Sequence, residues 1–338
     1  MSKRSEIKPG FADIAYAKRR RRETFLDKIN ELIDWYPIEK KLNRTLKRQS
    51  SSVGAQPYPA IVMFRALLLQ SWYNLSDTQL EDSLADRASF SVFAGLSLDH
   101  SVPDSTTICR FRNLLKDEFS DLLNLINKQL VQKKFINKDG MIADASIVES
   151  CCHPVKQEEV KLPESAAEPI EVSTTYSKDT DARWTVKGKT NYYGYKAHIG
   201  TDNVHGFVLS GHATAANVYD GHQLARLVDD CQLASGSLVI ADKGYCSKDN
   251  RVLLAKKKLL DGIMHKAVRN HPLNEAQRAY NKLLARMRNK VERVFGTFKR
   301  VYGFSRSRYM GIAKVEAELL QKSIAFNLKK AALLMLNA

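Results

Sequence analysis

The period of the hydrophobic pattern changes at about residue 138, and this change limits what the chain can fold into. Before it, apolar residues recur at helical spacing, and residues 61–72 are apolar nearly all round, which predicts a buried helix. After it, residues 140–148, 192–200 and 207–213 have strand patterns, and a turn joins the last two as a hairpin. We therefore expect an all-helical N-terminal domain over residues 1–135, followed by a domain that contains a sheet.

Helices and strands alternate in the second half of the chain. The pattern predicts a helix at 220–230, a strand at 237–241, a helix at 248–258, a strand at 262–267 and then a long helix that starts at Asn274. Hairpin and crossover connections together predict an α/β fold with a mixed sheet flanked by helices.

The domain limits follow from these patterns. The sheet domain is expected over 136–310, interrupted by a polar excursion at 150–190, and a final helix within 311–338 is expected to pack on it. With 44% hydrophobic residues, the chain can bury real cores in both parts.

The basic charge is concentrated at the two ends of the chain. The net charge is +16; residues 251–338 carry 20 basic and 5 acidic side chains, and residues 1–50 carry 14 and 7. Lysines and arginines that neutralise phosphates release counterions, so this distribution favours a nucleic acid over a membrane as the partner.

The sequence also bears on the compartment. It has no apolar run of about 18 residues, as a spanning helix requires, and its start lacks the apolar core of a signal peptide, so a cytoplasmic location is predicted. The five cysteines lack C-x-x-C spacing and are read as reduced thiols. Cys151-Cys152-His153 could be a metal cluster, but no second ligand pair follows at zinc-finger spacing, which favours a structural role.

Two basic segments of the N-terminal half are candidate DNA contacts. Arg19, Arg20, Arg21 and Arg22 form an arm for phosphates or a solvated helix face. A helix that opens at 103–106 places Arg110 and Arg112 near its start, as in a groove-reading helix-turn-helix, although ordinary helical hairpins have the same pattern.

Three carboxylates stand where local structure does not explain them. Asp144 lies inside a predicted strand, where aspartate is depleted, and Asp242 follows the strand at 237–241, at the edge where α/β sheets bind ligands. Glu292 is the only acidic residue between Glu275 and Glu316. Each has a simpler explanation, a turn cap for an aspartate or an ion pair with Arg288 for Glu292, so the hypothesis of a shared site depends on their convergence.

Three converging carboxylates suit metal-dependent phosphoryl transfer. Two Mg²⁺ ions, with Mn²⁺ as an alternative, can be held by carboxylates and substrate phosphates, and such a pair stabilises the attacking and leaving oxygens of an in-line displacement. On the long helix that carries Glu292, the basic side chains expected to contact phosphates are Arg288, Lys299 and Arg300.

Other residues are candidates for the surroundings of this site. Trp184 lies between Arg183 and the basic pair Lys187 and Lys189, where it could stack on an unpaired base or anchor a loop. His198 lies on the strand expected beside Asp144, near the site or packed in the sheet. Lys243 and Tyr245 follow Asp242 and are expected nearby.

Short motifs are spread over nearly the whole chain: Trp72-Tyr73-Asn74-Leu75-Ser76-Asp77, Leu96-Ser97-Leu98-Asp99, Val102-Pro103-Asp104-Ser105-Thr106-Thr107, Ala143-Asp144-Ala145-Ser146-Ile147-Val148-Glu149, Tyr195-Lys196-Ala197-His198-Ile199-Gly200, Ala215-Ala216-Asn217, Ala241-Asp242-Lys243-Gly244-Tyr245 and Arg288-x3-Glu292-x6-Lys299. Together they resemble the DDE transposases of bacterial insertion sequences, most closely the insertion-sequence-five group.

This resemblance implies a ribonuclease-H-like catalytic domain with Asp144, Asp242 and Glu292 as its metal-binding triad. The implied reaction binds the terminal inverted repeats of the element, cuts its ends and joins the freed 3′-hydroxyls to target DNA. In one departure, related transposases often carry a tyrosine three residues before the helix arginine, where this chain has Ala285.

The expected partners are therefore double-stranded transposon ends and target DNA, bound by a homodimer or a larger synaptic assembly. Two alternatives stay open from the residues alone. A ribonuclease-H-like nuclease would cut without joining, and a DNA-binding regulator would use the carboxylates structurally.

Overall fold

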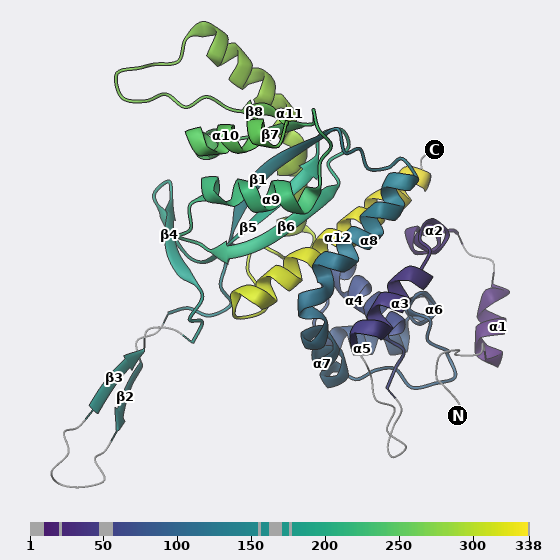
Figure 1. The fold of residues 1–338 in the computed structure, drawn as a ribbon. Helices are drawn as coiled ribbons and strands as arrows, with labels where there is room; N and C mark the ends of the chain where they lie inside the picture. The colour runs from purple at the N-terminus through teal and green to yellow at the C-terminus, as the bar shows by residue number, and fades with distance from the viewer. Residues whose placement is uncertain are drawn as a thin grey trace.

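The computed structural model describes residues 10–19, 22–46, 57–154, 157–161, 171–175 and 178–336. Its N-terminal part is helical, as predicted, and forms one body beside the sheet (Figure 1). The helices are α1 (Phe11–Ala17), α2 (Phe25–Leu32), α3 (Tyr36–Leu46), α4 (Ala60–Tyr73), α5 (Asp77–Asp86), α6 (Ala88–Ala94), α7 (Ser105–Leu115) and α8 (Phe119–Gln132), with a short turn η1 (Lys116–Glu118) before α8.

The sequence sets the limits of these helices. Helix α4 is buried on nearly all sides, as its apolar run predicts. Ser76 caps α5 in a capping box with Gln79, and the Asp104 side chain accepts the Thr107 N–H at the start of α7. The helix start predicted at 103–106 is confirmed.

The second half contains a six-stranded mixed sheet. Its strands are β1 (Gly140–Glu149), β4 (Arg183–Lys187), β5 (Thr190–Asp202), β6 (Val208–Ala215), β7 (Leu238–Ala241) and β8 (Leu260–Ile263). The order is β4-β5-β1-β7-β8, with β6 also paired to β5. Strand β5 is antiparallel to β1, β4 and β6, whereas β1, β7 and β8 are parallel. The expected α/β fold with a mixed sheet is confirmed.

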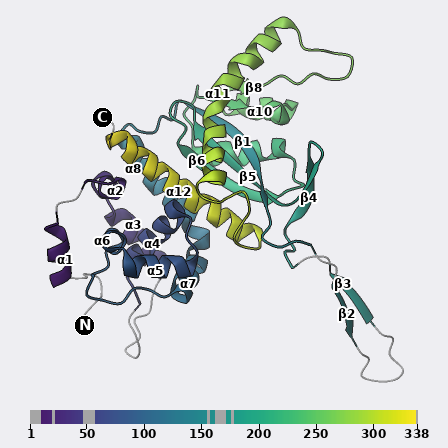
Figure 2. The same ribbon diagram turned by 180° about the vertical axis from the view of Figure 1, so that it is seen from behind.

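Helices cover both faces of the sheet. On one face α9 (Leu224–Cys231) follows a turn η2 (Asp220–Gln223), and Cys231 Sγ contacts Met141 Sδ at 3.2 Å. On the other face lie α11 (Glu275–Arg300) and α12 (Ile312–Leu336), while α10 (Lys248–Lys256) precedes β8 (Figures 1 and 2).

Helix α12 joins the two halves of the molecule rather than covering the sheet alone. It packs on β6 and also on α2, α4 and α8. Trp72 Nε1 donates to Ala325 O at 2.7 Å, and Asn327 Nδ2 donates to Asn127 Oδ1 at 2.8 Å. Figures 1 and 2 show α12 running between the sheet and the N-terminal helices. No helix within the described ranges has the length and apolar character that crossing a membrane requires.

Two predictions about strands need correction. The polar excursion contains strand β4 and a separate hairpin of β2 (Gln157–Lys161) and β3 (Glu171–Thr175), which projects from the body in both views. The last strand is β8, not 262–267. It ends early because the side chain of Asn281 takes up both backbone groups of His265, at 2.8 and 2.9 Å.

Candidate active site

Asp144 and Asp242 lie side by side because of the strand register. In the parallel pair of β1 and β7, Ala143 is opposite Ala241, and the next residue on each chain is the aspartate. Alternation along a strand puts both side chains on the face covered by α11. The position where β7 ends thus brings two carboxylates from distant parts of the sequence together.

Asp242 also shapes its own loop. It is the N-cap of a short turn η3 (Lys243–Tyr245), and its Oδ1 accepts the Gly244 N–H at 2.7 Å. Asp242 therefore caps a turn, as the simpler explanation for this residue predicts. The cap uses only Oδ1, so the other carboxylate oxygen can still bind a ligand.

Asp144 is held by a backbone group and by an arginine. Its Oδ1 accepts the Ala145 N–H at 3.0 Å and lies 3.1 Å from Nη2 of Arg288. Burial raises the pKa of Asp144 to about 6, and Arg288 opposes this shift while the charge of Asp242 adds to it. A single arginine thus compensates only part of the negative charge of the two aspartates.

Helix α11 supplies Arg288 and Glu292. Leu284, Val291, Val294 and Phe298 are buried along one side of the helix, and Arg288 is turned toward Asp144. Glu292 lies one helical turn beyond Arg288 on the same side of the helix and is exposed. The geometry pairs Arg288 with Asp144, whereas the sequence had suggested Glu292 as its partner.

Asp144 and Asp242 present carboxylate oxygens at one place on the sheet. Carboxylate oxygens are the ligands that hard divalent cations prefer, and the two partly buried aspartates share one arginine as counter-charge. In addition, Arg288 Nε and the Tyr245 hydroxyl are buried without a hydrogen-bond partner in the described part of the chain. The two aspartates fit such an ion. However, no three His, Cys, Asp or Glu side chains among the described residues are grouped so that they could hold a metal, so Glu292 does not form such a group with the two aspartates in this structure.

Comparison with known proteins identifies the family. A family model described as "Transposase DDE domain" matches residues 137–328, and one described as "Transposase domain (DUF772)" matches residues 14–114. The chain belongs to the DDE transposase family. A curated relative, the transposase for insertion sequence element IS1106 of Neisseria meningitidis serogroup B, is 40% identical over 227 residues, which cover 66% of this chain and 77% of the relative. The chain is accordingly an insertion-sequence transposase, an enzyme of the DDE class.

Two solved transposase complexes are weakly similar to this transposase. A piggyBac synaptic complex with hairpin DNA has 12% identity and a TM-score of 0.44, over 93% of this chain and 75% of that one. The Mos1 mariner paired end complex with Mn has 11% identity and a TM-score of 0.26, over 94% and 88%.

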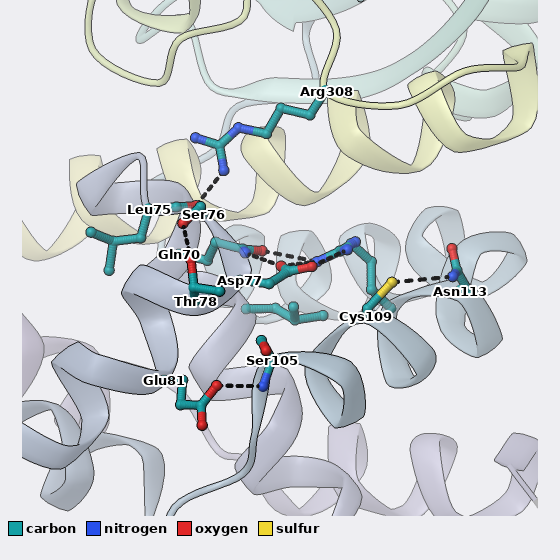
Figure 3. Close-up of polar contacts among 12 residues, drawn as sticks. Gln70, Leu75, Ser76, Asp77, Thr78, Glu81, Ser105, Cys109, Asn113 and Arg308 are labelled. Atoms are coloured by element: carbon teal, nitrogen blue, oxygen red, sulfur yellow. Dashed lines mark hydrogen bonds and ion pairs between the residues drawn. The ribbon is translucent and has the colours of Figure 1, made fainter.

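The prediction that Arg112 contacts DNA is wrong. Its guanidinium is buried, its Nη1 and Nη2 donate to the Asp77 carboxylate at 2.6 and 2.7 Å, and it lies over the Tyr309 ring at 4.6 Å. Figure 3 shows Asp77 beside Gln70, with Arg308 reaching Leu75 from the segment after α11. This transposase uses Arg112 to build the joint between α5, α7 and that segment, whereas Arg110 is exposed.

Replacing Asp77 by Ala should lower the free energy of unfolding by about 2–3 kcal/mol, because it leaves the buried Arg112 charge without its partner. Chemical denaturation would measure the loss. The control is Asp82→Ala on the same helix, where the exposed side chain predicts a change within about 0.5 kcal/mol. Equal effects of the two substitutions would contradict the assigned role of Arg112.

His198 is placed in the sheet core and not at the site. It is opposite Ala145 in the register, whereas Asp144 is opposite Ile199, so His198 and Asp144 point to opposite faces. Its ring stacks on His212 with centroids 5.0 Å apart, and its Nε2 lies 2.9 Å from Thr214 Oγ1. The packed alternative for this histidine is the correct one.

The remaining candidate DNA contacts of the transposase are at the surface or outside the described part. Arg20 and Arg21 lie outside the described residues. Trp184 is 56% exposed, although its ring lies 5.3 Å from that of Tyr193. The exposed basic candidates are Arg19, Arg22, Arg110, Lys187, Lys189, Lys243 and Arg300, and Lys299 is half-buried. Burial lowers the pKa of Lys299, and the nearby charge of Lys187 lowers it further, so β4 and α11 contribute to one basic surface.

Sequence reasoning missed residues that support the loop of Asp242. Lys196 Nζ lies 2.9 Å from Asp220 Oδ1 and donates to Val218 O at 2.8 Å, which fixes the start of η2. Just before η2, the Tyr219 hydroxyl donates to Gly244 O in η3. Lys196 lies in the motif Tyr195–Gly200, which could have marked it as important. However, nothing in the sequence indicates that it pairs with Asp220.

Proposed function

We propose that this transposase binds the terminal inverted repeats of an insertion sequence, cleaves the ends and joins the 3′-hydroxyls to target DNA by two-metal phosphoryl transfer. The observation that carries the proposal is the pair of carboxylates, Asp144 and Asp242, at the end of β7 with Arg288 beside them. Family membership supports the same reaction class.

In this proposal Asp144, Asp242 and Glu292 hold two divalent ions, Mg²⁺ or Mn²⁺, which supply an activated water and charge stabilisation when bound. Asp144 and Asp242 form the fixed part of the site, because the parallel pairing of β1 and β7 sets their separation. Glu292 is exposed on α11 and would have to turn toward the aspartates to complete the set of ligands. Arg288 would then be free to leave Asp144 and bind a DNA phosphate.

The basic side chains divide into two groups. Arg288, Lys299, Arg300, Lys187 and Lys189 would hold the phosphates near the cleaved bond, with Trp184 available for an unpaired base. Arg19, Arg20, Arg21, Arg22 and Arg110 would bind the end of the element further away. Two ends must be joined together, so the working form would be a homodimer or a larger assembly.

The test is an in vitro reaction with labelled duplexes that carry the terminal repeats flanking the coding region. We expect Mg²⁺-dependent cleavage and joined products, and no products with scrambled ends. Hydrolysis without joining would support the nuclease instead. Salt-sensitive binding with no cleavage at any metal concentration would support the regulator.

Substituting Lys187 or Lys299 by Gln should weaken end binding and reduce the slope of log affinity against log salt by about 0.9 each, because one phosphate contact is lost. Fluorescence anisotropy over a salt series would measure both quantities. Lys256→Gln, an exposed change on α10, serves as the control. A slope that stays the same in all three variants would exclude the β4–α11 surface from DNA binding.

A further inference from the structure

Tyr245 is buried beside the two aspartates with an unused hydroxyl. Its side chain is 1% exposed, and the hydroxyl has no hydrogen-bond partner in the described part of the chain. A buried donor without a partner costs about 1–3 kcal/mol. A tyrosine kept in this state implies that its partner arrives in another state of the molecule.

The backbone of Tyr245 is fixed from both sides. Its N–H donates to Asp242 O at 3.1 Å within η3, and its carbonyl accepts from Asn250 Nδ2 at 2.8 Å. The same amide group donates to Gly221 O at 2.9 Å, which ties η3 to η2. The backbone of Tyr245 is therefore fixed, and its buried side chain extends from a defined position in η3.

The surroundings of the hydroxyl are acidic. After burial, the charges of Asp144, Asp220 and Asp242 raise the pKa of Tyr245 well above its ordinary range, and Arg288 opposes them. The hydroxyl remains a donor, and the groups around it are acceptors. Arg288 Nε, also buried, lacks a partner in the same region of the described chain.

We propose that Tyr245 is a positioning residue for the metal site, whose hydroxyl donates a hydrogen bond to the carboxylate of Asp144 once that carboxylate releases Arg288. A carboxylate that holds a metal through one oxygen is commonly oriented by a hydrogen bond to the other, and loss of such a bond typically costs about 10–100-fold in metal affinity or activity. This inference rests on the proposed function, since it concerns the same metal site.

Tyr245→Phe tests the proposal because it keeps the ring and removes only the hydroxyl. Stability should be unchanged or slightly increased, since the hydroxyl lost has no partner in the free protein. The affinity for Mn²⁺, measured by electron paramagnetic resonance on a complex with an end duplex blocked at its 3′ terminus, should fall about 10-fold or more. The metal concentration for half-maximal strand transfer should rise by the same factor.

The matched control is Tyr280→Phe on α11. The Tyr280 hydroxyl donates to Asp261 O at 2.9 Å, so its loss should cost about 1 kcal/mol of stability and leave Mn²⁺ affinity unchanged. If Tyr245→Phe binds Mn²⁺ as the wild type does, the positioning role is overturned. A loss of stability in Tyr245→Phe with unchanged Mn²⁺ affinity would overturn it as well. If the wild-type complex binds no Mn²⁺, the proposed function itself fails.

Discussion

Asp144→Asn should reduce strand transfer by about 10³-fold or more, because a lost metal ligand removes several kcal/mol of transition-state stabilisation. The same substitution should make the protein more stable at neutral pH. Ionised Asp144 is disfavoured in the fold, since burial raises its pKa from 3.8 to about 6, and each pKa unit corresponds to about 1.4 kcal/mol. A neutral amide avoids this cost, so we expect a gain of about 1–3 kcal/mol at pH 7.5.

The sign of the pH dependence makes this prediction specific. The penalty is fully present above the folded pKa of about 6 and disappears below the unfolded value of 3.8, so the advantage of asparagine should vanish as the pH falls to about 4. Urea denaturation of the wild type and the variant across this range would measure it. An advantage that persists at pH 4 would show that the gain has another origin.

Glu292→Gln separates the chemical role from the stability effect. As a proposed metal ligand, Glu292 should be required for strand transfer, so its replacement should abolish the reaction. Because the side chain is exposed, the free energy of unfolding should change by less than about 0.5 kcal/mol. Glu275→Gln, an exposed change at the start of the same helix, should leave both quantities unchanged. Full strand transfer by Glu292→Gln would remove Glu292 from the proposed triad.

Acidification should destabilise the transposase through the His198 and His212 pair. Burial lowers the pKa of His198 to about 3, with the charge of His212 adding to the shift, and burial lowers that of His212 to about 4. Both therefore stay neutral in the fold while they become charged in the unfolded chain below about 6.5. The free energy of unfolding is therefore unaffected by the two histidines above pH 6.5 and decreases as the pH falls below it. At pH 5 the two histidines together lower it by about 4 kcal/mol, and the protonation of Asp144 offsets about 1 kcal/mol of this loss.

Variants can assign this loss to the two histidines. The double substitution His198→Gln and His212→Gln keeps an amide near Thr214 and Gln223 but cannot titrate, so the loss between pH 7.5 and 5 should largely disappear. His205→Gln, an exposed change, should preserve the wild-type profile. Parallel pH profiles for the double variant and the wild type would contradict the assignment.

The sequence was sufficient for the pairing of Asp144 and Asp242 because both depend on local rules. A strand pattern and its end are visible in the residues, and adjacent strand ends bring such side chains together. The excursion was harder: its strands are short and polar, and β4 exists only because β5 supplies the partner. Its hydrogen bonds come from residues that a local pattern does not identify.

The predictions for Arg112 and His198 depended on contacts between distant parts of the chain. Arg112 is buried because it pairs with Asp77, 35 residues earlier, and no local pattern predicts this pairing. His198 is on the expected strand, but only the register with β1 decides which face it takes, and a shift by one residue reverses the answer. Glu292 is identified by its isolation among basic residues, while its distance from the aspartates depends on the rotation of α11.

The placement of α12 has a consequence for how the chain reaches its native state during synthesis. Trp72 and Ala325 are joined by a hydrogen bond across 253 residues, so the N-terminal helices lack part of their core until α12 has been made. Contacts of such long range delay folding and leave apolar surface uncovered in the meantime. A nascent chain stopped after α11 should therefore depend on chaperones in both halves, not only in the half that contains the sheet.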